Sequence, residues 1–256
     1  MLNQQTSIIS GAESFYLQGS KEVGILLSHG FNGTPQSMEE LGELFNSKGY
    51  TVSAPRLPAH GTHEDDLLTV SYREWIEEIK TAFNQLKREC TNVFIVGQSM
   101  GGTLALFLGS EIKNVSGIIT INAAIKVPFY QQYKYKTSPL FIAEGKPDIK
   151  DESVFEIAYE NVSLHAIKQL LSLIDRTKEQ LANVTCPLIL LKSKIDNVVP
   201  PKSTDYIFNK VNSSYKKVIS LDNSYHVASM DFDKEKIVKV TSNFICDVMG
   251  SQFSIN

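Results

Sequence analysis

Long hydrophobic runs and paired cysteines are both missing from this chain. No apolar stretch is long enough to cross a bilayer, so we expect no membrane-spanning segment. The first ten residues hold neither a positively charged segment nor a long apolar one, which argues against a signal peptide and predicts a soluble cytoplasmic protein. The three cysteines are widely scattered and form no CxxC pair, so we expect reduced core residues and no disulfides.

An excess of charge of either sign is also lacking. The chain has 28 acidic and 25 basic residues, which gives a formal net charge of −3. This balance gives no reason to expect nucleic acid as a partner. His60 and His63 are close in sequence but have no cysteine or third clustered ligand nearby, so no metal site is predicted.

Apolar residues, by contrast, are plentiful. They make up 42% of the 256 residues, which is enough to bury a large core. Short apolar runs alternate with amphipathic stretches, and this pattern predicts a parallel sheet covered by helices on both faces, an α/β fold. The runs predict strands over 23–28, 50–54, 92–96, 117–121, 187–192 and 216–221, and the amphipathic stretches predict helices over 35–48, 71–88, 100–110, 203–210 and 234–249.

This alternation breaks between about residues 126 and 185. No strand candidate stands out there, and a helix is predicted over 163–176. We interpret 126–185 as an inserted cap, and residues 1–125 and 186–256 as the α/β core. Because the insertion follows a strand, we expect the cap over the carboxyl edge of the sheet, where open α/β sheets bind ligands.

One serine lies among glycines where a predicted strand turns into a predicted helix. The turn reads Gly97-Gln98-Ser99-Met100-Gly101, and Gly-x-Ser-x-Gly in that setting is typical of a nucleophile elbow. Such a turn projects the serine hydroxyl from the edge of the sheet, close to a helix N-terminus that stabilises negative charge. We therefore predict that Ser99 is a nucleophile and not merely a residue that fills a tight turn.

A serine hydroxyl is a weak nucleophile at neutral pH and needs a base. In folds with this elbow the acid and then the histidine follow the serine along the chain, and only His165 and His226 come after Ser99. His165 lies in the predicted cap helix, whereas His226 follows the last predicted strand, in a loop at the carboxyl edge. We predict His226 as the base, and we expect His29 to brace its own loop by hydrogen bonds.

The histidine in turn needs an acid that holds its far ring nitrogen. Asp196 directly follows the strand predicted over 187–192, and Asp222 follows the last predicted strand. Asp222 lies only four residues before His226 in the same loop, so we favour Asp196. A surface salt bridge is the alternative for the Asp196 carboxylate.

Two backbone N–H groups should stabilise the oxyanion that forms when the serine attacks. The first should belong to Met100, which directly follows the nucleophile. The second should belong to Phe31, because Gly30 precedes it and Gly33 follows in the same loop, leaving its backbone free to turn inward.

With these motifs in place, the sequence resembles bacterial monoacylglycerol lipases and closely related carboxylesterases of the α/β-hydrolase superfamily. The resemblance covers most of the chain and implies an α/β-hydrolase fold with a cap and the same site residues. One departure is Gln98, where these enzymes usually carry an apolar residue such as leucine. The matching segments are HGFNGTPQSM, SKGYTVSAPRLPAHGT, GQSMGG, INAAIKV, DIKDESVFEIAY, DNVVPP and NSYHVASMD.

The resemblance also implies how a substrate is held. The cap would roof an apolar acyl tunnel and form a smaller polar pocket for the alcohol, with brief contacts to a lipid surface. Glu156 is the candidate for binding a glycerol hydroxyl, with a solvated helix carboxylate as the alternative. Asn122 ends a predicted strand near the site, and it either contacts the alcohol or ties down the cap, of which we favour the second.

These features together predict a serine hydrolase that cleaves monoacylglycerols or related carboxylic esters through an acyl-enzyme. Its partner is a small ester with an acyl chain, and it needs no metal or organic cofactor. Two alternatives use the same fold: an acyl-thioesterase, for which no clear basic patch for a coenzyme A phosphate is present, and a receptor without catalysis. Turnover of a p-nitrophenyl ester would distinguish an enzyme from a receptor.

Overall fold

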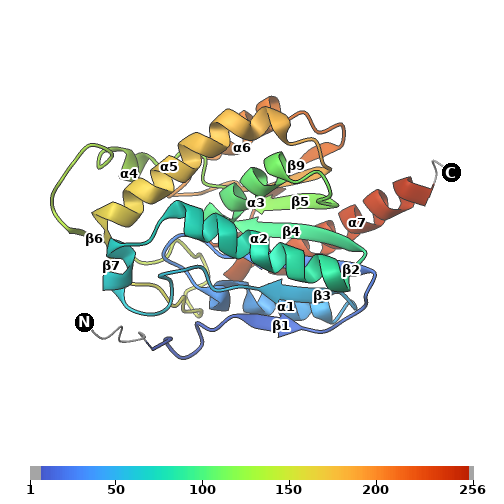
Figure 1. Cartoon of the computed structure of the whole chain (residues 1–256), viewed down its shortest axis with the longest axis horizontal. Coiled ribbons are helices and arrows are strands. Elements are labelled where there is room, and N and C mark those ends of the chain that lie inside the picture. Colours follow the sequence, from blue (N-terminus) through green and yellow to red (C-terminus); the bar gives the residue numbers. More distant parts are fainter. Residues whose placement is uncertain (1–6, 254–256) are drawn as a thin grey trace.

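A seven-stranded sheet forms the centre of the computed structural model, which describes residues 7–253 (Figure 1). Neighbouring strands are parallel, except that β1 runs antiparallel to β3. The order across the sheet is β1 (Phe15–Leu17), β3 (Thr51–Ala54), β2 (Val23–Ser28), β4 (Asn92–Gln98), β5 (Gly117–Ile121), β8 (Leu188–Ser193) and β9 (Lys216–Leu221). The six predicted strands and the α/β fold are confirmed. β1 was not predicted, because three residues at an edge leave too short a pattern.

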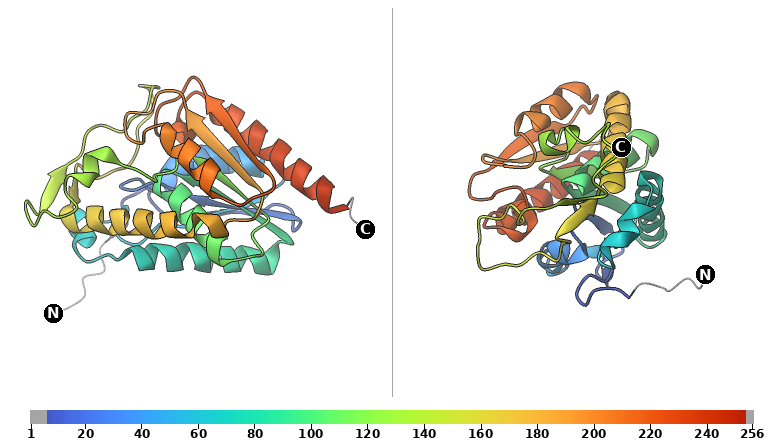
Figure 2. Two further views of the ribbon diagram at one scale, coloured as in Figure 1. Left: turned by 90° about the horizontal axis from the view of Figure 1, so that it is seen from above. Right: turned by 90° about the vertical axis from the view of Figure 1, so that its left-hand side faces the viewer.

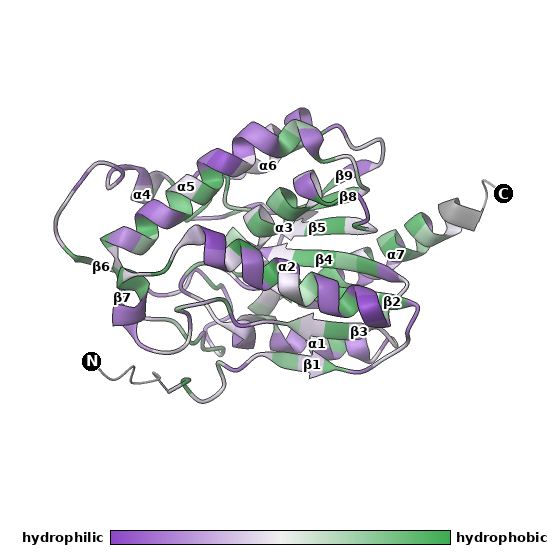
Figure 3. Ribbon diagram, in the orientation of Figure 1, coloured by the Kyte–Doolittle hydropathy of each residue, from purple (hydrophilic) through white to green (hydrophobic). Residues whose placement is uncertain are grey.

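Helices cover both faces of the sheet, because successive strand side chains point to opposite faces. In β4, Ile95 belongs to the hydrophobic cluster that includes α2 (Tyr72–Glu89), α3 (Met100–Glu111), α5 (Leu164–Gln180) and α6 (Lys202–Lys210). Its neighbours Phe94 and Val96 belong to the cluster that includes α1 (Glu39–Asn46) and α7 (Lys234–Phe253). Figure 2 shows the two helical layers, and Figure 3 shows that the strands are mostly hydrophobic while the outer helix faces are polar.

Local chemistry explains where the long helix α2 begins. α2 starts with a capping box, in which the Ser71 hydroxyl accepts from the Arg73 N–H and the Glu74 carboxylate accepts from the Ser71 N–H. The helix predicted over 35–48 is divided, with a 3-10 turn at Pro35–Met38 followed by α1. α3 is buried from Met100 to Gly109, since it packs on the sheet and against α2 and α5. The elbow therefore sits on a rigid base.

The stretch between β5 and β8 contains α4 (Pro128–Gln131), β6 (Phe141–Ala143), β7 (Asn161–Ser163) and α5. β6 and β7 form a separate antiparallel pair. The prediction that this stretch holds no strand is wrong, because strands of three residues leave no alternating pattern. α5 packs on α2 and α3 as part of the helical layer, so the irregular part of the stretch lies before it.

The segment between β6 and β7 crosses the carboxyl edge of the sheet. It is hydrogen-bonded to the loop after β2 through Asn32 and Tyr159, and to the loops after β8 and β9 through Asp148. The cap boundaries at 126 and 185 stay a prediction. Among residues 7–253, no helix is long and apolar enough to cross a membrane.

Candidate active site

Ser99 sits at a strained turn between β4 and α3. Its backbone has φ 53° and ψ −114°, in the left-handed half of conformational space that non-glycine residues rarely adopt. Two backbone hydrogen bonds hold it there: the Ser99 N–H donates to the Ile121 carbonyl at 2.9 Å, and the Ser99 carbonyl accepts from Ala124 at 3.0 Å. A Cβ on Gly101 would collide with the backbone of Ser28, so glycine is required next to this turn.

The three residues predicted as a triad form one chain of hydrogen bonds. Ser99 Oγ lies 2.9 Å from Nε2 of His226, and Nδ1 of His226 lies 2.8 Å from Oδ2 of Asp196. The side chains of His226 and Asp196 are 8% and 2% exposed, so this chain is shielded from water. With the proton on Nδ1, the imidazole donates to Asp196 and accepts from the Ser99 hydroxyl, which is the arrangement a general base needs.

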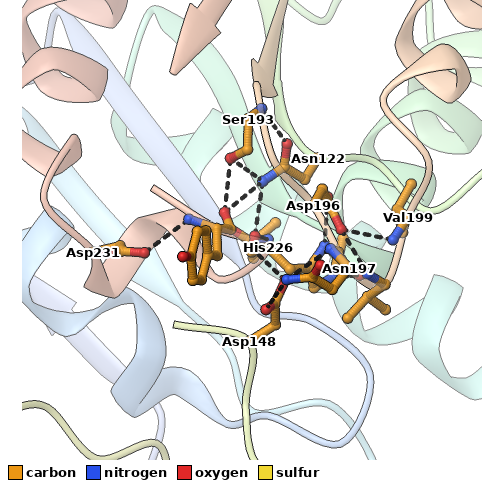
Figure 4. A network of polar contacts seen from close by, with 12 residues as sticks. Asn122, Asp148, Ser193, Asp196, Asn197, Val199, His226 and Asp231 are labelled. Atoms are coloured by element: carbon orange, nitrogen blue, oxygen red, sulfur yellow. Dashed lines mark hydrogen bonds and ion pairs between the residues drawn. The ribbon is translucent and has the colours of Figure 1, made fainter. Parts of the chain in front are cut away.

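The loop after β8 holds the Asp196 carboxylate in place. Oδ1 accepts from the backbone N–H groups of Val198 at 2.9 Å and Val199 at 2.7 Å, which leaves Oδ2 for the histidine (Figure 4). The competing acid, Asp222, is turned away from this site. Its carboxylate accepts from the Ser220 hydroxyl and from Lys236, and these contacts lower its pKa.

The remaining histidines have structural contacts. His29 Nε2 accepts from the Leu57 N–H at 3.1 Å and His29 Nδ1 donates to the Gly30 carbonyl at 2.9 Å, so the ring braces the loop after β2. Burial lowers the pKa of His29 well below its ordinary value and that of His60 to about 4, which keeps both rings neutral. His165 contacts the Val70 carbonyl. Within residues 7–253, no cluster of three or more histidine, cysteine or acidic side chains could hold a metal ion.

The two predicted oxyanion donors are both available. In the described part of the chain, neither the Phe31 N–H nor the Met100 N–H donates to another protein group. Met100 is the first residue of α3, whose leading N–H groups have no partner within the helix. Gly30 lies against Ser99, where a Cβ on Gly30 would be 3.4 Å from the Ser99 Cβ, and this brings the Phe31 backbone to the nucleophile.

A cavity of about 400 Å³ opens beside Ser99 and His226. It lies between the loops of the carboxyl edge and the stretch between β5 and β8. Its wall combines apolar and polar side chains, and includes Phe31, Val127, Phe129, Tyr130, Leu170, Val198, Asn32, Glu144, Asp148 and Glu156. A mostly apolar cavity with a few polar groups suits an amphipathic small molecule.

Glu156 lies in the wall of this cavity and not on a helix. Its carboxylate is next to Gly33, where an added Cβ would lie 2.6 Å from Oε1. Burial raises the pKa of Glu156 to about 7, and the nearby His226, when charged, opposes that rise. Glu156 is thus half-buried beside the cavity, and the part of the alternative that placed it on a helix is wrong.

This pKa predicts a pH-dependent cost of folding. An ordinary glutamate has a pKa of 4.5, and Glu156 has one of about 7, so between these values it ionises in the unfolded chain but stays protonated in the folded one. Ionisation then favours unfolding, and the stability of the protein falls as the pH rises through this window. The loss above the window is up to about 3 kcal/mol, since one pKa unit corresponds to about 1.4 kcal/mol.

Glu156→Gln should remove this cost. We expect the melting temperature of the variant, relative to wild type, to rise between about pH 5 and about pH 8. Glu152→Gln, which replaces an exposed carboxyl of the same segment, is the matched control and should show no such trend. If the melting temperatures of Glu156→Gln and wild type differed by the same amount at about pH 5 and about pH 8, the raised pKa of Glu156 would be contradicted.

Asn122 lies behind the histidine loop and outside the cavity wall. Its Nδ2 donates to the Ser193 hydroxyl at 2.8 Å and to the His226 carbonyl at 2.8 Å, and its Oδ1 accepts from the Ser193 N–H at 2.8 Å. The side chain is thus fully engaged with the protein, and its contacts are with the loop after β9 and with β8.

Sequence reasoning missed two polar side chains that contact the same loop. Gln98, noted from the sequence only as a departure from the usual apolar residue, donates from Nε2 to the His226 carbonyl at 2.7 Å. Asp148 accepts from the His226 N–H at 3.1 Å. The sequence signal at Gln98 was a polar residue where an apolar one is expected, and we noted no signal at Asp148.

The chain is similar to known proteins along most of its length. The family model of serine aminopeptidase, S33, matches residues 19–146 and 155–233. A thermostable monoacylglycerol lipase from Bacillus sp. (strain H-257) is 37% identical over 251 residues, which cover 97% of this chain and 100% of that protein. A carboxylesterase from Bacillus subtilis (strain 168) is 25% identical over 227 residues, which cover 86% of this chain and 91% of that protein.

Solved structures share the fold. One of two metagenome-derived lipolytic enzymes, LipS and LipT, has a TM-score of 0.90 at 37% identity and covers 94% of this chain and 100% of its own. A soluble variant of monoglyceride lipase from Saccharomyces cerevisiae has a TM-score of 0.78 at 17% identity, with 92% and 90% covered. Since the family model matches most of the chain and a relative matches it almost end to end, the chain belongs to the serine aminopeptidase S33 family of the α/β-hydrolase superfamily and is a serine hydrolase.

Proposed function

We propose that this enzyme hydrolyses monoacylglycerols and related single-chain carboxylic esters to a fatty acid and an alcohol. The observation that carries the proposal is the hydrogen-bonded chain from Ser99 through His226 to Asp196, which opens on a largely apolar cavity. The lipase and carboxylesterase among the relatives support the same chemistry. A cytoplasmic location stays a prediction from the sequence.

The mechanism assigns each residue of the site a step. Ser99 Oγ attacks the ester carbonyl while Nε2 of His226 takes its proton. The N–H groups of Phe31 and Met100 donate to the oxyanion of the tetrahedral intermediate. His226 then protonates the leaving alcohol, and an acyl group remains on Ser99.

Hydrolysis of the acyl-enzyme repeats these steps with water. His226 accepts a proton from the water, the oxyanion forms again, and Ser99 recovers its proton as the fatty acid leaves. Asp196 holds the imidazole in the required tautomer and stabilises its charged form throughout. None of these steps calls for a metal or an organic cofactor.

The cavity wall supports an acyl ester with a small polar alcohol. Phe31, Val127 and Leu170 provide apolar surface for the acyl chain. Glu156 is the group we assign to a glycerol hydroxyl, because its carboxyl faces the cavity and none of the described residues 7–253 hydrogen-bonds to it. We assign Asn122 to positioning the histidine loop, because its amide is already bonded to that loop.

The outer surface of the stretch between β5 and β8 supports brief contact with lipid. Four large apolar side chains are exposed there: Phe129, Tyr135, Leu140 and Phe155. Several large apolar side chains exposed in one segment next to a cavity suit an interaction surface. We propose that it brings the cavity to a lipid aggregate from which the substrate is taken.

Monoacylglycerols should be hydrolysed much faster than triacylglycerols. Two further acyl chains on the leaving group find no room in a cavity of about 400 Å³ that already holds one chain. Drawing even four methylenes of these chains out of a lipid aggregate into water costs about 3 kcal/mol, so we expect triolein to react at roughly a hundredth of the rate of monoolein or less.

A panel of monoolein, triolein, a p-nitrophenyl ester and an acyl-coenzyme A tests this proposal. All are presented in the same detergent micelles, so that the interface does not differ between substrates. Triolein hydrolysed as fast as monoolein would contradict the roofed cavity. A clear preference for the acyl-coenzyme A would replace the ester proposal with the thioesterase alternative.

A further inference from the structure

One residue of the cap segment is bonded to both loops that carry the acid and the base. Asp148 Oδ2 accepts from the backbone N–H of Asn197 at 3.0 Å and from that of His226 at 3.1 Å (Figure 4). Oδ1 accepts from Nδ2 of Asn197 at 2.7 Å, and the Asp148 carbonyl accepts from the Val227 N–H at 3.1 Å. Asn197 directly follows Asp196, so one carboxylate joins the acid loop to the base.

The backbone of His226 is held on its other side as well. Its carbonyl accepts from Nε2 of Gln98 at 2.7 Å and from Nδ2 of Asn122 at 2.8 Å. Gln98 is the neighbour of Ser99, and Asn122 follows β5. With the N–H contact to Asp148, both backbone polar groups of His226 are hydrogen-bonded to side chains. The imidazole ring of His226 meanwhile contacts Ser99 and Asp196.

A second carboxylate fixes the place of Asp148 itself. Asp231 is fully buried, and its Oδ2 accepts from the N–H groups of Lys150 and Tyr225, at 2.8 and 2.9 Å. Its Oδ1 accepts from the Asp151 N–H at 3.2 Å. Residues 148–151 are thus attached to the histidine loop twice: directly by Asp148, and through Asp231, which bonds to Lys150 and Tyr225.

We propose that Asp148 is a positioning residue for the triad, whose carboxylate holds the loops of Asp196 and His226 in the alignment that proton transfer needs. The proposal rests on the proposed function above. A displacement of about 1 Å in a catalytic group can cost on the order of a hundredfold in rate. A group that acts in this way affects the chemical step and leaves substrate binding largely unchanged.

Asp148→Ala and Asp148→Asn separate this role from others. The alanine variant loses all three side-chain contacts, and we expect kcat to fall by about ten- to a hundredfold with KM within about threefold of wild type. The asparagine variant can present its amide oxygen to both backbone N–H groups and its amide N–H to a flipped Asn197 side chain. We expect it to retain kcat to within about threefold, because asparagine restores the hydrogen bonds without restoring the negative charge.

Reaction with a small alkyl fluorophosphonate gives a second readout. This probe labels the serine and carries no glycerol, so its rate should fall in Asp148→Ala by the same factor as kcat. Asp151→Ala is the matched control, because the Asp151 carboxylate hydrogen-bonds only to Ser153 among the described residues, and it should leave both rates unchanged.

If Asp148→Ala does not fold, Asn197→Ala offers a second test. It removes one contact of the Asp148 carboxylate and should lower kcat several-fold at constant KM.

Distinct outcomes would overturn the proposal. A kcat within threefold of wild type in the folded alanine variant, or an unchanged kcat in Asn197→Ala, excludes the positioning role. A raised KM at constant kcat makes Asp148 a substrate-binding group, and equal losses in the alanine and asparagine variants make its charge the active feature. Ser99→Ala is measured alongside, because turnover that survives in that variant rejects the proposed function itself and not only the role of Asp148.

Discussion

Ser99→Ala should abolish ester hydrolysis and leave the fold intact. The Ser99 hydroxyl is the nucleophile of the proposed mechanism, and its Oγ lies 2.9 Å from Nε2 of His226. No other hydroxyl is bonded to that ring nitrogen among residues 7–253. Loss of a triad nucleophile costs on the order of a million-fold in turnover. The measurement is the rate of p-nitrophenol release from a short-chain ester. The melting temperature of the variant shows whether it is folded.

Ser28→Ala is the matched control for this variant. Ser28 is buried at the end of β2, and its hydroxyl has no hydrogen-bond partner within the described chain, so its loss should change turnover by no more than a few-fold. If Ser99→Ala kept more than a tenth of wild-type turnover, another residue would have to be the nucleophile.

Asp196→Asn should lower turnover by roughly ten-thousand-fold, the loss that this change produces in a chymotrypsin-type triad. The amide can still accept from Val198 and Val199, so the loop keeps its shape. The amide N–H, however, would donate to Nδ1 of His226 and move the ring proton to Nε2. That nitrogen could then no longer accept the Ser99 proton.

Asp222→Asn distinguishes the two candidate acids. Asp222 is bonded to Ser220 and Lys236 at the surface, and a surface pair of this kind contributes little to stability or activity. We expect turnover of Asp222→Asn to stay within a few-fold of wild type. A larger loss in Asp222→Asn than in Asp196→Asn would mean that the wrong carboxylate was assigned to the histidine.

The core of the fold and the hydrogen-bonded grouping of Ser99, His226 and Asp196 could be predicted because their signals are local. The central strands β2 and β4 contain continuous apolar runs, and the elbow is a five-residue pattern between a strand and a helix. The chain order of serine, acid and histidine then leaves few choices. Asp196 and His226 both follow strands that end at one edge of the sheet, so the topology brings them together.

The contacts around the histidine loop could not be predicted in this way. Gln98 and Asp148 contact His226 across 128 and 78 residues of sequence, and both bond to backbone groups, which leave no pattern in the side chains. The same holds for Asn122, whose position after β5 suggested contact with the alcohol or the cap but whose amide bonds to Ser193 and His226. The short strands β6 and β7 were missed because their pairing depends on tertiary context and not on periodicity.

Covalent labelling of Ser99 is the most direct measurement of the proposed chemistry. A long-chain alkyl fluorophosphonate places phosphorus where the ester carbonyl carbon would react, and its adduct is not released. Intact mass and peptide mapping should find one adduct, on the peptide that contains Ser99, with hydrolysis lost in proportion to labelling. An adduct on a different residue, or full hydrolytic activity in the labelled protein, would contradict an acyl-enzyme on Ser99.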